Sequence, residues 1–420
     1  MPTPFESVKF NRQHVDRTFW VIFLILVGVS VLALFSSSST LIHKATAQGH
    51  NPIYPIAMQI LYVGIGVGIA WVLQFLPSWV YRLFGYVLLG LGMLFLLLNA
   101  AHIGVTINGA TRWVRIAGIT IQSSELAKVG LIIVVTHLLS QIKDSESERR
   151  NFLWALGLTG VTCLLIMIGN LSTAILLGAV IILLMILARI PWKWWTGIIV
   201  AAALFLVIGY LFVEYAYVRP EREMKGPLSR AQTWVNRIDR KLEEHSEEGD
   251  AYKITDDNYQ AMLARVAVAM GGKSPIGVLP GNSLERDHLP LANADYIFAI
   301  IVEETGFVGA LLLCFLYLSV LFRCCYASSR YNDYAAQLMM MGLGLMLTLQ
   351  ALVSMAVAVG LGPVTGQPLP LISKGGTSAI ITSIYFGMMM GVSREQNQKK
   401  AQQEQTIEES MQEVPELNTD

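Results

Sequence analysis

The sequence predicts an all-α, polytopic membrane protein with about ten transmembrane helices, both termini inside, and a long outer loop that carries an amphipathic helix. Hydrophobic residues make up 54% of the chain and charged residues only 14%, whereas a soluble domain has about a quarter charged residues. The charged residues are concentrated in short segments between long apolar runs, which is the pattern of a helix bundle in a bilayer. The formal net charge is zero, so no bulk field favours nucleic acid as a partner.

The apolar runs predict the positions of the spans, because a helix needs about 20 apolar residues to cross the hydrocarbon core. Ten runs of this kind lie near residues 18–37, 53–76, 81–99, 125–141, 151–169, 172–188, 193–215, 296–324, 333–359 and 376–393. They divide the chain into a cytoplasmic leader (1–17), a transmembrane domain (18–393) and a cytoplasmic tail (394–420). The tail is rich in Gln and Glu without an apolar period, which predicts a disordered segment or a frayed helix.

Basic residues predict the orientation, because short loops that are rich in Lys and Arg stay on the cytoplasmic side. With the N-terminus inside, the inner segments hold most of the basic residues, and an even number of spans returns the C-terminus to the same side. The long outer loop at 216–294 does not bear on this, because long loops translocate largely regardless of charge. Its part from Tyr259 to Met270 has apolar residues at helical spacing, which predicts an amphipathic helix at the membrane interface.

Ionisable residues at the outer ends of two spans are candidates for function, because charges inside a membrane are costly. Glu125 and Lys128 are neighbours on one helix face; we expect an ion pair, with a helix-positioning role and a substrate role equally open. Asp295 stands at the beginning of an apolar helix, where the helix dipole favours an acid. Glu303 and Glu304 lie two turns deeper and need cationic or hydrogen-bonding partners. Three acids on one helix predict a polar cavity that opens outward.

A second polar region interrupts the chain before the last span. Pro and Gly residues between Pro363 and Gly376 break the helix at membrane depth, which is tolerated only where the backbone is buried in protein or lines a cavity. The run from Ser373 to Ser378 opens the last helix, and its amide groups, hydroxyls and single ammonium suit a phosphate.

Six short sequence motifs occur in order along the chain, and together they are more specific for a protein family than any one of them alone. They are Asn108 to Trp113, Gln122 to Lys128, Tyr259 with Gln260, Gly281 to Ser283, Asp295 to Gly306, and Pro368 to Ser378. In order and spacing they resemble the SEDS family of cell-wall polymerases, which includes FtsW, RodA and SpoVE. The leader, Phe35 with the serine run at 36–39, and the short tail look more like FtsW. The Pro-Val-Thr-Gly piece at 363–366 is more RodA-like.

The chain departs from the family pattern at four positions. Ser123 stands where the family has Pro, Asn293 where it has His, and Lys374 where it has Tyr. Asn170 replaces an Asp, which removes any role proposed for that carboxylate. None of these changes touches Asp295.

The resemblance implies a peptidoglycan glycosyltransferase in the bacterial inner membrane, with its active face in the periplasm. It would polymerise lipid II and release undecaprenyl pyrophosphate, in septal cell-wall synthesis during cell division. Asp295 is the implied catalytic base, since the attacking sugar hydroxyl has to lose a proton. The implied substrate-binding residues are Arg112, Glu125, Lys128, Gln260, Ser283, Glu304, Ser373, Lys374 and Thr377.

The resemblance also implies partners and leaves alternatives open. The leaving pyrophosphate needs a cation, which Arg112, Lys128, Lys374 or a divalent cation such as Mg²⁺ would supply; no protein metal site is predicted. The implied partners are lipid II, a class B penicillin-binding protein with transpeptidase activity, and divisome proteins. A flippase for the lipid-linked precursor and a RodA-type elongation polymerase remain alternatives. A flippase needs a path on both faces, whereas the polar clusters crowd the outer face. The clustered acids and bases argue against an inactive scaffold.

Overall fold

The computed structural model describes residues 15–37, 46, 51, 53–101, 103–107, 110–116, 119–142, 144–217, 259–285, 294–362 and 366–412. Within these ranges nine helices are long and apolar enough to cross a membrane, and a tenth, α7 (Leu171–Leu187), is a shorter apolar helix. The prediction of an all-α membrane protein with about ten spans is therefore confirmed. The beginning of the leader, most of the long outer loop and the last residues of the tail lie outside the described ranges.

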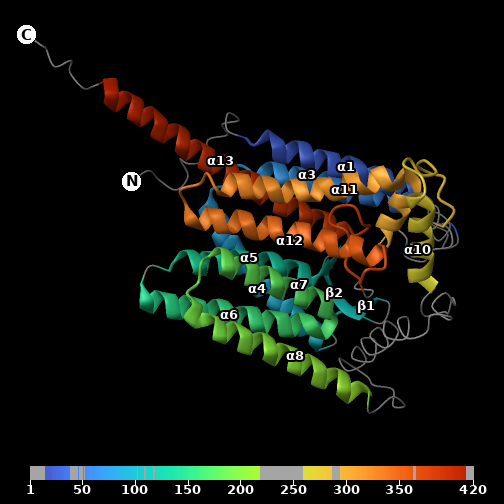
Figure 1. Ribbon diagram of the computed structural model, residues 1–420, viewed down its shortest axis with the longest axis horizontal. Coiled ribbons are helices and arrows are strands. Elements are labelled where there is room, and N and C mark those ends of the chain that lie inside the picture. The colour runs from blue at the N-terminus through green and yellow to red at the C-terminus, as the bar shows by residue number, and fades with distance from the viewer. Residues whose placement is uncertain are drawn as a thin grey trace, which may run out of the picture.

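The spans follow one another as a bundle of roughly parallel and antiparallel helices (Figure 1). They are α1 (Arg17–Ser36), α3 (Tyr54–Leu73), α4 (Ser78–Ala100), α5 (Ser123–Ser140), α6 (Ser145–Gly169), α7, α8 (Trp195–Tyr217) after the short η2 (Trp192–Trp194), α11 (Ile297–Ser328), α12 (Tyr334–Ala358) and α13 (Gly376–Gln412). The beginning of α1 and the end of α13 lie at the same end of the bundle. This agrees with an even number of crossings, and we call this the inner end.

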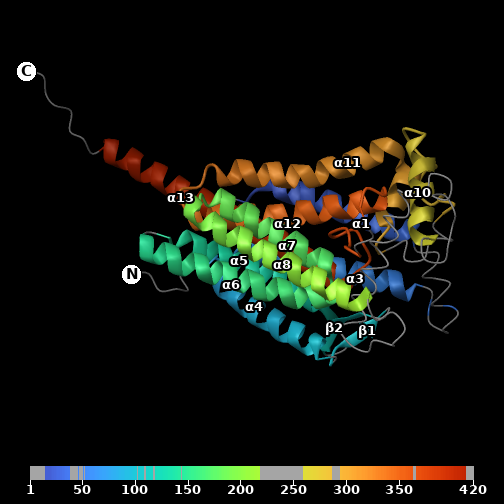
Figure 2. The same cartoon turned by 60° about the horizontal axis from the view of Figure 1, so that its bottom comes forward.

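The opposite, outer end of the bundle carries the predicted amphipathic helix, α10 (Tyr259–Gly272), which lies across the ends of the spans (Figure 2). The side that faces the protein is formed by small residues and one methionine: Met262, Ala264, Ala267 and Gly271. Val266 and Met270, which were expected on the same apolar face, are 38% and 43% exposed. The helix thus has one apolar side packed on α11 and another turned away from the protein.

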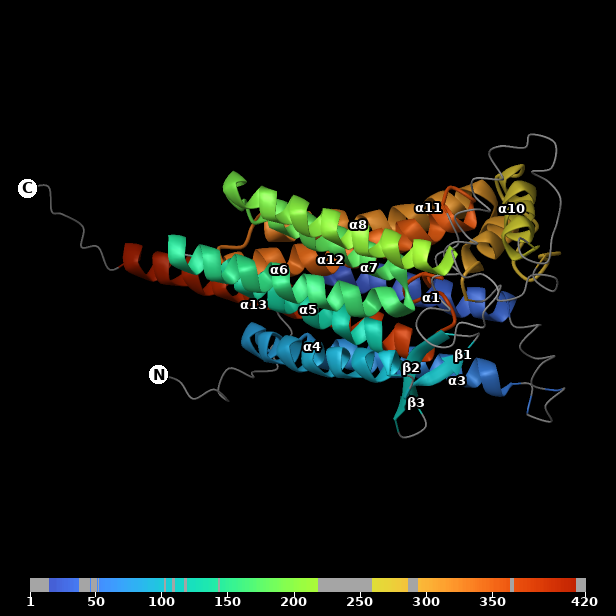
Figure 3. The ribbon, with the colours of Figure 1, turned by 90° about the horizontal axis from the view of Figure 1, so that it is seen from below.

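A three-stranded antiparallel sheet also lies at the outer end (Figure 3), and the sequence did not predict it. Its strands are β1 (Val105–Ile107), β2 (Ala110–Ile116) and β3 (Ile119–Gln122). β2 and β3 pair with Trp113 opposite Gln122 and Arg115 opposite Thr120. The residues of β2 and β3 include the β-branched and aromatic types that favour strands. The sheet matters because β2 carries Arg112 and β3 leads directly into α5.

The helix α5 lies at the centre of the bundle and is buried along most of its length. It packs closely against α4 because glycine stands at the contact. A Cβ on Gly92 of α4 would lie 2.6 Å from the backbone nitrogen of Ala127 on α5. Small residues allow helices in a membrane to approach in this way. The close contact sets the position of Lys128, the next residue along α5.

The last helix, α13, continues past its predicted end at residue 393 and is helical to Gln412. The part beyond the span was expected to be disordered or a frayed helix. Its described residues, up to Gln412, are helical. Arg394 donates a hydrogen bond to the carbonyl of Phe75 at 2.9 Å. The next residue, Glu395, accepts one from the backbone N–H of Ser78 at 2.6 Å. These contacts join the inner end of α13 to the turn between α3 and α4.

Candidate active site

Asp295 and Arg112 are far apart in the sequence, and both side chains lie close to Gly366. A Cβ added to Gly366 would be 3.7 Å from Arg112 Nη1 and 3.7 Å from Asp295 Oδ2. Arg112 Nη1 and Asp295 Oδ2 therefore lie no farther from each other than twice 3.7 Å. Gly366 has a φ of +61°, a left-handed conformation that glycine adopts without strain. Because Gly366 has no side chain, the space next to the carboxylate and the guanidinium stays open at this position.

Asp295 is half-buried in the turn before α11, and Ser373 holds that turn. The Ser373 hydroxyl donates a hydrogen bond to the carbonyl of Ala294 at 2.6 Å. It also accepts one from the backbone N–H of Leu369 at 2.8 Å. Ser373 is only 2% exposed, so it acts on Asp295 through the backbone of the preceding residue.

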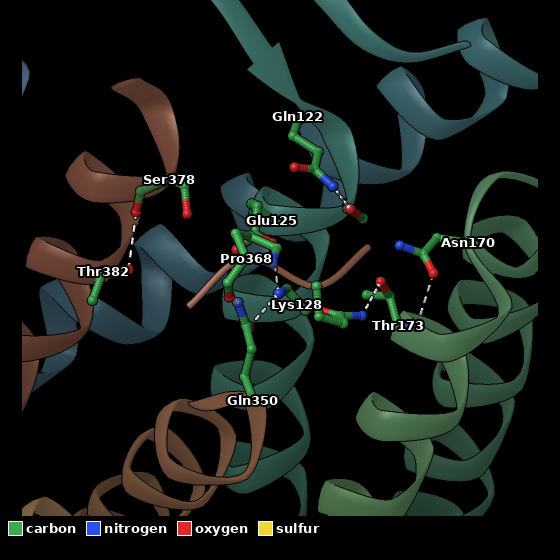
Figure 4. A network of polar contacts seen from close by, with 11 residues as sticks. Gln122, Glu125, Lys128, Asn170, Thr173, Gln350, Pro368, Ser378 and Thr382 are labelled. Atoms are coloured by element: carbon green, nitrogen blue, oxygen red, sulfur yellow. Dashed lines mark hydrogen bonds and ion pairs between the residues drawn. The ribbon is translucent and has the colours of Figure 1, made fainter. Parts of the chain in front are cut away.

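The predicted ion pair between Glu125 and Lys128 is confirmed (Figure 4). Lys128 Nζ lies 2.7 Å from Glu125 Oε1 and donates to Gln350 Oε1, also at 2.7 Å. Gln350 in turn donates to the carbonyl of Pro368 at 3.2 Å. Lys128 is 0% exposed, and a buried ammonium has to be paired in this way. The geometry therefore supports the positioning role: the pair anchors the segment that contains Gly366.

Asn170, one of the departures from the family pattern, follows Gly169, which lies close to the side chain of Arg112. A Cβ on Gly169 would be 3.6 Å from Arg112 Cγ. Asn170 caps α7, because its Oδ1 accepts a hydrogen bond from the backbone N–H of Thr173 at 3.3 Å. The Thr173 hydroxyl accepts a hydrogen bond from Gln367 at 2.5 Å, which ties the cap to the segment around Gly366. Asp and Asn cap helices about equally well, so the change keeps the cap and removes a negative charge near Arg112.

The backbone of α11 is broken at Gly306, where φ is +70°. In a continuous helix the carbonyls of Glu303 and Glu304 would accept from the amides of Phe307 and Val308. Here they accept instead from Val278 at 3.0 Å and Leu279 at 2.8 Å. The amides of Phe307 and Val308 donate to the carbonyls of Ser274 and Pro275. The segment 274–285 is thus inserted into the break of the helix.

The side chains of Glu303 and Glu304 hold the same segment. Glu303 accepts hydrogen bonds from the Ser283 hydroxyl at 2.5 Å and from the backbone N–H of Leu284 at 2.8 Å. Glu304 accepts from the Ser36 hydroxyl and from the N–H of Gly281. Glu303 is 0% exposed and Glu304 is 4% exposed. The expected hydrogen-bonding partners are confirmed, whereas the prediction of one outward cavity shared with Asp295 is wrong for these two acids. A substrate role for Ser283 and Glu304 stays a prediction.

The other candidate residues are distributed around the outer end. Thr377 donates to the carbonyl of Thr120 at 3.1 Å, which joins the beginning of α13 to the sheet. Lys374 is exposed, and Gln260 on α10 is half-buried. Asn108 and Asn293 lie outside the described residues. Gln350 was missed by the sequence analysis, although a Gln inside an apolar span is itself a signal of a buried polar contact.

The described part of the site combines one carboxylate with cations and offers no protein metal centre. Asp295 can accept a proton, and the guanidinium of Arg112 suits a phosphate. Among the described residues no group of three His, Cys, Asp or Glu side chains lies close enough to hold a metal ion.

A family model and curated relatives match nearly the whole chain. The family model of the FtsW/RodA/SpoVE cell cycle proteins matches residues 16–398. An Enterococcus hirae protein described as a probable peptidoglycan glycosyltransferase FtsW is 28% identical over 95% of this chain and 97% of its own. The peptidoglycan glycosyltransferase MrdB of Escherichia coli K12 is 25% identical over 93% of this chain and 96% of its own.

Solved structures share the fold. A chain from a peptidoglycan synthase complex that coordinates polymerization and crosslinking superposes with a TM-score of 0.68 at 23% identity, covering 91% of this chain and 99% of that one. The Rod shape determining protein RodA of Thermus thermophilus superposes with a TM-score of 0.59 at 21% identity, covering 92% and 99%. At these identities the structures establish the fold, and the family model establishes the relationship. The chain is a multi-pass membrane protein that belongs to the FtsW/RodA/SpoVE family of cell cycle proteins.

Proposed function

We propose that this chain is a peptidoglycan glycosyltransferase that polymerises lipid II into glycan strands and releases undecaprenyl pyrophosphate. The observation that carries the proposal is that the Asp295 carboxylate and the Arg112 guanidinium both lie close to Gly366. A base and a cation at one place are what a sugar transfer with a pyrophosphate leaving group requires. Relatives that are named peptidoglycan glycosyltransferases and match nearly the whole chain support it.

In the proposed reaction Asp295 acts as a general base. A sugar hydroxyl of one substrate attacks the anomeric carbon of the other, and Asp295 takes the hydroxyl proton as the new glycosidic bond forms. The bond from the anomeric carbon to the pyrophosphate oxygen breaks, and its electron pair leaves with that oxygen. The negative charge that develops there is stabilised by Arg112, with Lys374, which is exposed in the segment before α13, as a second cation. One displacement of this kind inverts the anomeric configuration.

Lys128 has a different place in this mechanism. Its ammonium is buried between Glu125 and Gln350, so it positions the segment 366–373 and does not meet the leaving group. A divalent cation such as Mg²⁺ would act on the substrate pyrophosphate itself, and the polymerisation assay below therefore includes arms with and without Mg²⁺.

The biological setting follows from the relatives and is part of the proposal. We place the outer end, with Asp295 and Arg112, at the periplasmic face of the bacterial inner membrane. Septal synthesis is proposed ahead of elongation because the relatives named FtsW match at 26% to 29% identity, against 25% for MrdB. A class B penicillin-binding protein is the proposed partner, supported by the similarity to a chain of a peptidoglycan synthase complex. Divisome proteins would then position the pair at the septum.

The experiment that tests this function separates polymerisation from translocation. The purified full chain, with its class B partner, is given lipid II in detergent, and glycan products are resolved by size with and without Mg²⁺. In parallel, liposomes that contain the chain are tested for movement of lipid II between leaflets. Chain growth in the first assay is the expected result. Movement of lipid II without any chain growth would overturn the proposal in favour of a flippase.

A further inference from the structure

A polar cleft lies at the inner end of the bundle, opposite the site of Asp295. Its lining residues come from the turn that joins α11 to α12 and from the part of α13 that follows the span. Both segments lie at the inner end in Figure 1. Its volume is about 500 Å³. The side chains that decide its character are Arg330, Asp333, Gln396, Lys399, Lys400 and Glu404. None of them has a role in the proposed reaction.

The cleft carries more positive than negative groups. Arg330 is exposed and lies over the ring of Tyr326, with 4.0 Å between its guanidinium carbon and the ring centroid. Among the described residues no carboxylate pairs with Arg330. Lys400 lies 3.8 Å from Glu404, and both side chains are 63% exposed, so this pair is a weak surface contact. Arg330 and Lys400 are therefore available to an anion.

The two acidic residues of the cleft and its third cation, Lys399, already have hydrogen-bond or ion-pair partners in the protein. Asp333 caps α12, since its Oδ1 accepts a hydrogen bond from the N–H of Ala335 at 3.0 Å. Lys399 lies 2.9 Å from Glu395 and 3.8 Å from Asp333. The remaining acid, Glu404, is the solvent-exposed partner of Lys400. The charged residues that line the cleft are thus three cations and two acids, and Arg330 is the cation to which no described carboxylate is paired.

Gln396 is the observation that points to a ligand. It lines the cleft and is only 6% exposed. Its Nε2 is buried and has no hydrogen-bond partner among the described residues. A buried amide N–H without an acceptor is unfavourable, and native proteins rarely keep one. Because two cations lie in the same cleft, the missing acceptor is best supplied by an anionic oxygen.

We propose that this cleft binds the phosphate group of an anionic phospholipid from the inner leaflet. The turn between the end of α11 at Ser328 and the beginning of α12 at Tyr334 is where the chain leaves the membrane on the inner side, which is the level of the lipid headgroups. Basic pockets between transmembrane helices on the cytoplasmic side bind such headgroups. The Arg330 guanidinium and the Gln396 amide donate to the phosphate oxygens, and Lys400 contributes charge.

The test measures lipid retained by the purified full chain. Wild type, R330Q and Q396M are purified in detergent with added phosphatidylglycerol, and the bound lipid is quantified by native mass spectrometry. K193Q is the matched control, because Lys193 is an exposed cation next to the beginning of α8, whose partner is Glu148. Arg330 is exposed, so R330Q does not depend on core packing, and Q396M keeps the volume of the side chain.

We expect R330Q and Q396M each to weaken phosphatidylglycerol binding about tenfold, because each removes one hydrogen bond to a charged group. K193Q should retain as much lipid as wild type. Equal retention by all four proteins would overturn the proposal, and it is also the result expected if a protein segment fills the cleft. An equal loss in K193Q would show non-specific attraction and overturn it too. A further arm adds inorganic phosphate: displacement of the lipid by an equal concentration would assign the cleft to soluble phosphate and contradict the lipid assignment.

Discussion

The hydroxyl of Ser373 donates a hydrogen bond to the carbonyl oxygen of Ala294 at 2.6 Å. This contact joins the irregular segment before α13 to the turn that carries Asp295. The segment itself is anchored from α5 and α12, because Lys128 binds Gln350 and Gln350 binds the carbonyl of Pro368. A continuous path of buried polar contacts therefore runs from the centre of the bundle to the proposed catalytic base.

The first prediction concerns Ser373. S373A removes the tether to Ala294, so Asp295 is held less accurately, and small displacements of a catalytic group can cost about 100-fold in rate. We expect the rate of glycan polymerisation to fall about 10- to 100-fold, with a loss of stability of about 1–3 kcal/mol from the two groups left unsatisfied. The matched control is S383A, because Ser383 is also buried and donates to a carbonyl within its own helix, to Ala379 at 2.8 Å. A wild-type rate for S373A would remove Ser373 from this role.

The second prediction concerns the space between Asp295 and Arg112. G366A places a methyl group 3.7 Å from both side chains and forces a non-glycine residue into the left-handed region, which costs about 1–2 kcal/mol. We expect the rate of polymerisation to fall by more than this loss of stability explains. G28A is the control, because a Cβ on Gly28 meets no atom within 4 Å, and it should polymerise at the wild-type rate. Full activity of G366A would show that the substrate does not use this gap.

The third prediction concerns the buried pair of Glu125 and Lys128. K128M leaves the carboxylate of Glu125 buried without its cation, which typically costs about 3–5 kcal/mol. The double variant E125Q/K128M removes both charges and should recover much of that loss. Thermal unfolding of wild type, E125Q, K128M and the double variant in detergent measures the difference. If the double variant is as unstable as the sum of its two single variants, the two side chains do not act as a pair.

The fourth prediction concerns the segment inserted at Gly306. E303A removes the acceptor for Ser283, Leu284 and Glu285, and a hydrogen bond to a charged group contributes about 1.5–3 kcal/mol. We expect the amides of Leu284 and Glu285 to exchange with deuterium at least about tenfold faster, because opening of the segment becomes easier. E404A, a change at an exposed acid on α13, is the control and should leave their exchange unchanged. Unchanged exchange in E303A would contradict the anchoring role.

The fold class, the spans and the ion pair of α5 could be predicted from the sequence because each rests on a strong physical constraint. Apolar length sets the spans, and the cost of a buried charge demands a partner for Lys128. The sheet at 105–122 was missed because its strands are short and lie next to a polar cluster. The partners of Glu303 could be expected but not named, because they come from a loop whose path depends on the break at Gly306. Sequence spacing carries no information about that insertion.

The closeness of Arg112, Gly366 and Asp295 could not be predicted from spacing either. These residues come from a strand, a helix break and the turn before another helix, and only tertiary packing brings them together. The resemblance to a known family named two of them as site residues. The sequence pointed to Gly366 only as part of a polar stretch. The structure shows that it has a left-handed backbone conformation and lies close to Arg112 and Asp295.

The most direct test of the central claim is the initial rate of lipid II polymerisation by D295N with its class B partner, compared with wild type. Asparagine keeps the size of the side chain and cannot accept the proton, so we expect the rate to fall by a factor of about 10² to 10⁴ with an unchanged unfolding temperature. D144N serves as the control, because Asp144 is an acid at the inner end that caps α6 and Asn caps equally well; its rate should equal that of wild type. Polymerisation by D295N at the wild-type rate would contradict the account.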